Sequence, residues 1–131
     1  MLKKGITTAA ILLLTLFIWS VGVRADENNL IRAEATAYIL TGTTSSGSDT
    51  REGICASGRP EWQGKTLALY KRNGDSIGEF IGYYECLDSG CHKNVIDVWC
   101  ADMEKAQEFM DLVYSDGCDG HIYVSVIEAK G

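Results

Sequence analysis

The stretch that decides the fold runs from residue 84 to 99 and reads Tyr84-Glu85-Cys86-Leu87-Asp88-Ser89-Gly90-Cys91-His92-Lys93-Asn94-Val95-Ile96-Asp97-Val98-Trp99. It holds an acidic turn at Asp88 and, nine residues later, a second acid, Asp97, within the apolar run 95–99. Apolar runs of this kind are usually buried, and a carboxylate within one is costly to remove from water. Such an acid is either paired or protonated at a raised pKa, as a general acid must be. The alternative is a strand residue that faces solvent.

Outward from this stretch, short apolar segments alternate with turn signals. The predicted strands span residues 33–38, 53–57, 65–71, 77–86, 95–100 and 121–127. Asn73-Gly74-Asp75 is a hairpin sequence, because Asn-Gly tolerates the positive φ angles of a tight turn. Asp102 is expected to cap a helix over residues 103–113. Six strands with one or two short helices predict a small, mostly β barrel.

The N-terminus has the features of an export signal. Lys3 and Lys4 precede an uncharged stretch from 5 to 23, and small residues at Val23 and Ala25 form a cleavage site. Because that stretch also approaches the ~20 residues that span a bilayer, residues 1–25 are either a signal peptide, the favoured interpretation, or a membrane anchor. A polar lead-in at 26–32 and one domain at 33–131 are then expected outside the cytoplasm, secreted or associated with the cell surface or wall.

The charge of the chain excludes one class of partner. The sequence has 12 Lys and Arg against 18 Asp and Glu, and residues 1–25 hold three of the bases and no acid, so cleavage leaves 9 − 18 = −9. Nucleic-acid binding needs a basic surface, so no nucleic-acid partner is expected.

The exported part has an odd number of cysteines. They are Cys55, Cys86, Cys91, Cys100 and Cys118. One or two disulfides are expected in an oxidising compartment. Cys86 with Cys91 and Cys100 with Cys118 are both plausible pairs. A metal site built on Cys86, Cys91 and His92 with either Cys100 or His121 would follow no recognised zinc spacing, so neither a metal nor a cofactor is expected.

Six segments occur in a distinctive order along the chain. They are 35–38 (Ala-Thr-Ala-Tyr), 41–47 (Thr-Gly-Thr-Thr-Ser-Ser-Gly), 53–56 (Gly-Ile-Cys-Ala), 87–90 (Leu-Asp-Ser-Gly), 95–99 and 104–109. In this order they resemble the three-aspartate (3D) domain, a double-psi β-barrel of bacterial cell-wall enzymes related to membrane-bound lytic transglycosylase A. The resemblance covers nearly everything from Ala33 to Gly131.

The resemblance implies cleavage of the β-1,4 bond between N-acetylmuramic acid and N-acetylglucosamine in peptidoglycan glycan strands. One aspartate acts as general acid/base and the sugar's 6-hydroxyl attacks, which gives a 1,6-anhydro product. On this basis Asp97 is the catalytic acid and Asp88 its partner. The family's third aspartate is replaced by Gly58, and Glu61 or Ser57 is a candidate substitute.

Further residues are candidates for holding the glycan, although each is equally compatible with an ordinary loop or core position. They are Thr43, Thr44, Ser45, Lys93, Asn94 and Trp62, of which Trp62 is expected to be exposed for stacking. The leading hypothesis is a peptidoglycan lytic transglycosylase. The alternatives are a wall-binding or interaction domain that kept the barrel and lost activity, and a structural domain with disulfides.

Overall fold

The computed structural model describes residues 30–115 and 118–127, and the expected signal or anchor and most of the lead-in lie outside these ranges. The described part is mostly β, with six strands, one α-helix and one 3-10 turn. These elements are β1 (Ile31–Tyr38), β2 (Ile54–Ser57), η2 (Pro60–Trp62), β3 (Thr66–Asn73), β4 (Ser76–Asp88), β5 (Val95–Trp99), α2 (Met103–Tyr114) and β6 (His121–Ile127). Every strand predicted from the sequence is present, with bounds that differ by a few residues.

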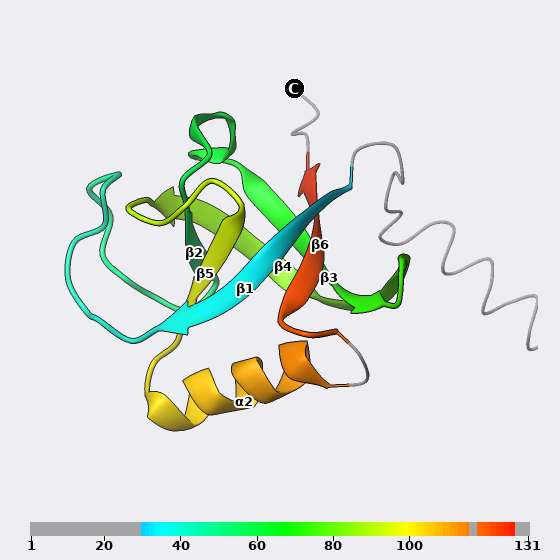
Figure 1. Cartoon of the computed structure of the whole chain (residues 1–131). Coiled ribbons are helices and arrows are strands. Elements are labelled where there is room, and N and C mark those ends of the chain that lie inside the picture. Colours follow the sequence, from blue (N-terminus) through cyan, green and yellow to red (C-terminus); the bar gives the residue numbers. More distant parts are fainter. Residues whose placement is uncertain (1–29, 116–117, 128–131) are drawn as a thin grey trace, which may run out of the picture.

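The strands form one mixed sheet in the order β1-β5-β2-β4-β3-β6 (Figure 1). The pairs β1–β5 and β2–β4 are parallel, whereas β2–β5, β3–β4 and β3–β6 are antiparallel. Because β6 also pairs antiparallel with β1, each strand has two hydrogen-bonded neighbours and the order returns to its start. Both parallel pairs lie on the side of the ring that contains the two acids.

Local sequence explains the two clearest boundaries. Gly74 has a φ of +63° in the turn between β3 and β4, where Asn73 pairs with Ser76, so the predicted hairpin is confirmed. The Asp102 carboxylate accepts a hydrogen bond of 2.8 Å from the Lys105 backbone N–H, which confirms it as the N-cap of α2. Within the described ranges, no helix has the length and apolar character needed to cross a bilayer.

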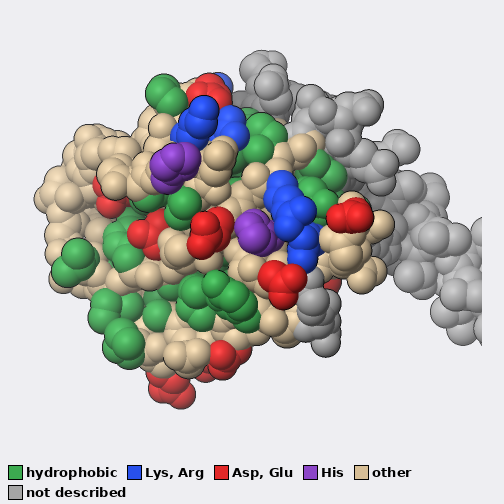
Figure 2. Space-filling model, in the orientation of Figure 1, with side chains coloured by type: hydrophobic (Ala, Val, Ile, Leu, Met, Phe, Trp, Pro, Cys, Tyr) green, Lys and Arg blue, Asp and Glu red, His purple; other side chains and the backbone are tan. Residues whose placement is uncertain are grey.

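The core fills the inside of the sheet and extends beneath α2, which lies at one end of the sheet (Figure 1). Inward-facing residues alternate along the strands, as Ile96 and Val98 do on β5, and α2 adds Phe109 and Val113. The residues between the inward positions, Asp97 among them, face the other side of the sheet. The surface in Figure 2 carries acidic and basic side chains interspersed, with hydrophobic side chains gathered toward α2.

Candidate functional site

The two aspartates of the opening stretch flank one small residue on the outer face of the sheet. Ala56 on β2 pairs with Asp97 on β5 and with Asp88 on β4. Adjacent strands lie about 4.8 Å apart, so the two acidic residues stand roughly 10 Å apart at their Cα atoms across Ala56. The methyl side chain of Ala56 leaves space between the two carboxylates.

A β-bulge turns Asp88 toward this face. Cys55 pairs with Cys86, but the next residue of β2, Ala56, pairs with Asp88, so Leu87 is an extra residue in β4. Side chains alternate between the two faces of a strand, and in a regular strand Asp88 would point into the core with Cys86. The bulge reverses that direction and brings Asp88 to the side of Asp97.

Asp97 lies in an environment that favours its protonated form. Its carboxylate accepts a hydrogen bond of 2.9 Å from the Thr36 hydroxyl of the paired strand β1. Burial, followed by the nearby negative charge of Asp88, raises the pKa of Asp97, and the hydrogen bond from Thr36 only partly opposes this. The direction of this shift agrees with one of the alternatives expected for an acid in an apolar strand, protonation at a raised pKa.

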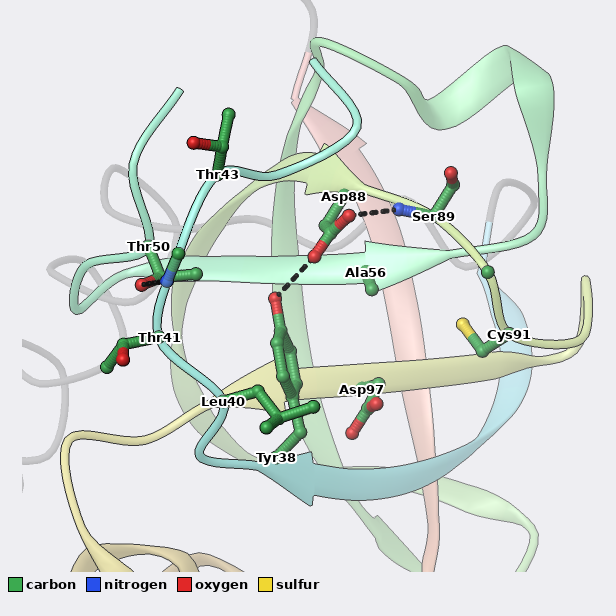
Figure 3. Close-up of a pocket in the computed structure, with 12 residues that line it drawn as sticks. Tyr38, Leu40, Thr41, Thr43, Thr50, Ala56, Asp88, Ser89, Cys91 and Asp97 are labelled. Atoms are coloured by element: carbon green, nitrogen blue, oxygen red, sulfur yellow. Dashed lines mark hydrogen bonds between the residues drawn. The ribbon is translucent and has the colours of Figure 1, made fainter. Parts of the chain in front are cut away.

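Asp88 has the opposite character. Burial alone would raise its pKa, but hydrogen bonds outweigh burial and hold the pKa of Asp88 below its ordinary value. The Ser89 backbone N–H (2.9 Å) and the Tyr38 hydroxyl (3.1 Å) donate to the carboxylate (Figure 3). The Ser45 backbone N–H donates to it as well, at 3.0 Å. Tyr38 itself stays protonated, because burial and the Asp88 charge raise the pKa of its hydroxyl. One acid of the pair is thus held as an anion and the other is biased toward its neutral form.

Both carboxylates line a cavity of about 310 Å³, which is open to solvent (Figure 3). This volume is at the lower end of the range for small-molecule sites. The loop after β1 contributes Leu40, Thr41 and Thr43 to one side, and the segment after β4 contributes Ser89 and Cys91. Leu40 is 78% exposed, so the cavity has an apolar side chain at its edge.

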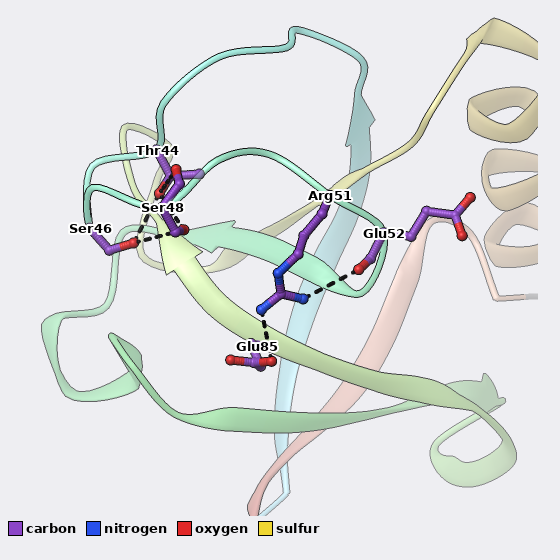
Figure 4. Close-up of polar contacts among 6 residues, drawn as sticks. All are labelled: Thr44, Ser46, Ser48, Arg51, Glu52 and Glu85. Carbon is purple, nitrogen blue, oxygen red and sulfur yellow. Dashed lines mark hydrogen bonds and ion pairs between the residues drawn. The ribbon is translucent and has the colours of Figure 1, made fainter.

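Hydrogen bonds fix the loop between β1 and β2 against the end of β4 (Figure 4). The hydroxyls of Thr44, Ser46 and Ser48 lie within 2.9–3.3 Å of one another. Arg51 pairs with Glu85 of β4 at 2.9 Å. These contacts hold the loop in a defined conformation, in which it forms one side of the cavity.

The three residues of this loop that were predicted to bind the glycan lie in different environments. Thr43 lines the cavity, and Ser45 reaches Asp88 through its backbone N–H. Thr44 is only 5% exposed and its hydroxyl bonds within the loop, so it is a structural residue there.

The prediction that Trp62 is exposed is wrong, because its side chain is 2% exposed and packs in the core. The 3-10 turn that begins at Pro60 directs the ring inward, and the Arg59 guanidinium covers it at 4.9 Å from the ring centroid. Arg59 also pairs with Glu61 at 3.3 Å and donates to the side-chain oxygen of Asn94 at 3.0 Å.

The remaining candidates lie outside the cavity. Glu61 is exposed and held by Arg59, and Lys93 and Asn94 are exposed in the loop between the two acids. None of the three is among the residues that line the cavity. Within residues 30–115 and 118–127, no three His, Cys, Asp or Glu side chains gather into a group that would hold a metal ion.

Comparisons of the chain with protein-family models, curated proteins and solved structures found no match. The functional information in this chain therefore lies in the arrangement of its two acids.

Two residues that position the acids were not predicted in that role. Thr36 and Tyr38 lie two residues apart on β1, so both face the site, and they donate to Asp97 and Asp88 respectively. The available signal was the period-two spacing of two hydroxyl residues beside the strand that carries Asp97.

Tyr38→Phe is expected to raise the pKa of Asp88, because it removes one of the donors that stabilise the anion. If activity needs Asp88 ionised, the acidic limb of the pH–rate profile moves to higher pH while the alkaline limb, set by Asp97, stays in place. The measurement is the pH–rate profile of both proteins on peptidoglycan, the substrate that the resemblance implies. Tyr114→Phe, on the exposed surface of α2, is the control. An unchanged acidic limb would show that Tyr38 has no such role.

Proposed function

We propose that the chain is an exported enzyme that cleaves the glycan strands of peptidoglycan, of the lytic transglycosylase type, and that its closed strand order is a double-psi β-barrel. The observation that carries the proposal is the pair of aspartates with opposite pKa shifts in one solvent-open cavity. Two carboxyl groups whose environments drive their pKa values apart are the usual mark of an acid/base assignment. The resemblance to the three-aspartate domain supplies the substrate class.

In this mechanism Asp97 gives its proton to the glycosidic oxygen as the bond from C1 to that oxygen breaks. The 6-hydroxyl of the same N-acetylmuramic acid then bonds to C1, and its proton passes to the Asp97 carboxylate, so the acid is restored. Asp88 stays ionised throughout, which adds to burial in raising the pKa of Asp97 and stabilises positive charge that develops at the sugar ring. One proton donor is sufficient because the substrate provides the nucleophile.

A second function is favoured by Gly58, which stands where the resemblance places the third aspartate. A Cβ atom at this position would lie 2.7 Å from the Lys93 backbone nitrogen and would also overlap the Cys91 carbonyl oxygen. The loop between the acids therefore occupies the space of the third carboxylate. A domain with this change can keep a wall-binding surface while it lacks catalysis.

The deciding experiment is digestion of purified peptidoglycan by the full chain, with the products analysed by mass spectrometry. Muropeptides with 1,6-anhydro ends are expected. Fragments with ordinary reducing ends would show that the enzyme is a hydrolase and not a transglycosylase. Co-sedimentation with the wall in the absence of any cleavage product would establish the binding domain instead, and neither binding nor cleavage would refute both functions.

A further inference from the structure

Two of the five cysteines face each other in the core. Cys55 on β2 and Cys86 on β4 are register partners, and each is 0% exposed. The two cysteines are 4.4 Å apart, and both are free thiols. Both belong to the core on the inner side of the sheet, opposite the face that carries Asp88 and Asp97.

The other cysteines have no comparable arrangement. Cys100 precedes α2 and Cys118 follows it, and a helix of 12 residues is about 18 Å long. Cys100 and Cys118 were one of the two plausible pairs, but both are unbonded, and their thiols contact different strands, Cys100 at the Val98 carbonyl oxygen and Cys118 at the Arg72 carbonyl oxygen. Cys91 lies on the cavity side, where its thiol is 3.8 Å from the Val95 carbonyl oxygen.

The register of Cys55 and Cys86 meets the spacing requirement of a disulfide. Neighbouring strands are about 4.8 Å apart, within the Cα range that a disulfide accepts. An exported chain also folds where disulfides form and persist.

We propose that Cys55 and Cys86 form a disulfide during folding, and that this bond fixes β2 to β4 beside the bulge that directs Asp88 to the site. The oxidant is a small disulfide such as oxidised glutathione. One cysteine thiolate attacks it and releases a glutathione thiolate, and the second cysteine thiolate then displaces the other glutathione. The chain loses two protons and two electrons, and the oxidant becomes two thiols.

The exchange takes place before the sheet is closed. In the folded, reduced chain both thiols are buried, so neither sulfur is accessible to an oxidant in solution. Thiol–disulfide exchange depends on access to the attacking sulfur, so these two thiols react slowly once the sheet is closed. Folding under reducing conditions therefore gives a stable dithiol form, whereas folding under oxidising conditions gives the linked form.

The position of the bond fixes the strand register next to the bulge that directs Asp88 to the site. The pair Cys55–Cys86 is the last regular pair before Leu87, the extra residue of the bulge. A slip of one residue there would return Asp88 to the core face. A covalent link at this pair prevents the slip, and this role does not depend on which substrate the acids act on.

The test is to refold the full chain with oxidised glutathione or with reducing agent, alkylate free thiols and map the peptides without reduction. We expect a peptide pair linked through Cys55 and Cys86, a mass lower by about 2 Da for the two hydrogens lost, and a thermal midpoint higher by about 10 °C than that of the reduced chain. A link between Cys86 and Cys91, glutathione retained on the chain, or five alkylated cysteines after oxidative refolding would overturn the proposal.

Matched variants separate the bond from general effects of oxidation. Cys100→Ala, at another buried cysteine, should keep both the linked peptide and the difference in thermal midpoint between oxidised and reduced chains. Cys55→Ala should abolish both. If the Cys55→Ala chain shows the same oxidative stabilisation as the unmodified chain, another pair is responsible and the proposal is wrong.

Discussion

Replacement of Asp97 by Asn is expected to lower the rate of glycan cleavage by about 10²- to 10⁴-fold, the contribution of a positioned general acid. Asn has nearly the shape of Asp and can still accept the hydrogen bond from Thr36, but it has no proton to give to the leaving oxygen. The measurement is the rate of 1,6-anhydro muropeptide release by the two proteins at the same pH. Glu79→Gln, which changes an exposed acid on β4, serves as the control and should keep the full rate.

The same substitution should not destabilise the chain at neutral pH, which distinguishes loss of chemistry from loss of fold. The folded-state pKa of Asp97 is raised, so its favourable contribution exists below the unfolded pKa and is lost as pH rises through the folded value. Above the unfolded pKa this carboxyl costs free energy in the folded chain, because it must either take up a proton or carry its charge in a buried setting, and Asn removes that cost. The thermal midpoint of Asp97→Asn is therefore expected to equal or exceed that of the unmodified chain. Full activity in this variant would refute the assignment of Asp97.

Most of the fold could be predicted from the sequence because its signals are local. The Asn-Gly turn, the Asp102 cap and the period-two strands each depend on residues a few positions apart, and all are present in the structure. The mixed pairing of the strands has no such signal. It joins residues far apart in the chain, such as Thr36 with Asp97. The number of short strands suggested a small, mostly β barrel, but it could not give their order or which pairs are parallel.

The site was predicted less completely, for reasons that also concern distance along the chain. An acid in an apolar strand identified Asp97, but the inward direction of Trp62 depends on Arg59 and on the core beneath it. The direction of Asp88 depends on a bulge that arises only when β2 and β4 are paired. The sequence of β4 alone would place Asp88 on the same face as Cys86.

The bulge also relates the structure to the chemistry. A carboxylate on the core face would be costly to ionise, whereas on the outer face Asp88 meets three donors and is held as an anion. Its charge is one reason that the pKa of Asp97 is raised. The pair therefore depends on one extra residue in β4 as much as on the acids themselves.

Gly58→Asp, the change that would restore the third aspartate of the resembling family, is expected to destabilise the chain by about 3 kcal/mol or to prevent folding. The Cβ atom would lie 2.7 Å from backbone atoms of His92 and Lys93 and would overlap the Cys91 carbonyl oxygen, so backbone and not a flexible side chain must move. Chemical denaturation monitored by Trp fluorescence measures the loss in free energy of unfolding. Activity is expected to fall with it, because the displaced segment carries the Cys91 side of the cavity.

The matched control is Gly82→Ala, at another glycine that has no positive φ. Its Cβ atom would meet the edge of the Tyr84 ring at 3.3 Å, and that ring can rotate away. The free energy of unfolding should therefore change by less than about 1 kcal/mol. Gly58→Ala has the same Cβ atom as Gly58→Asp without the charge, so it should share most of the loss. If Gly58→Asp instead folds with unchanged stability and cleaves faster, the loop between the acids can yield, and the two-acid site is an incomplete form of a three-acid one.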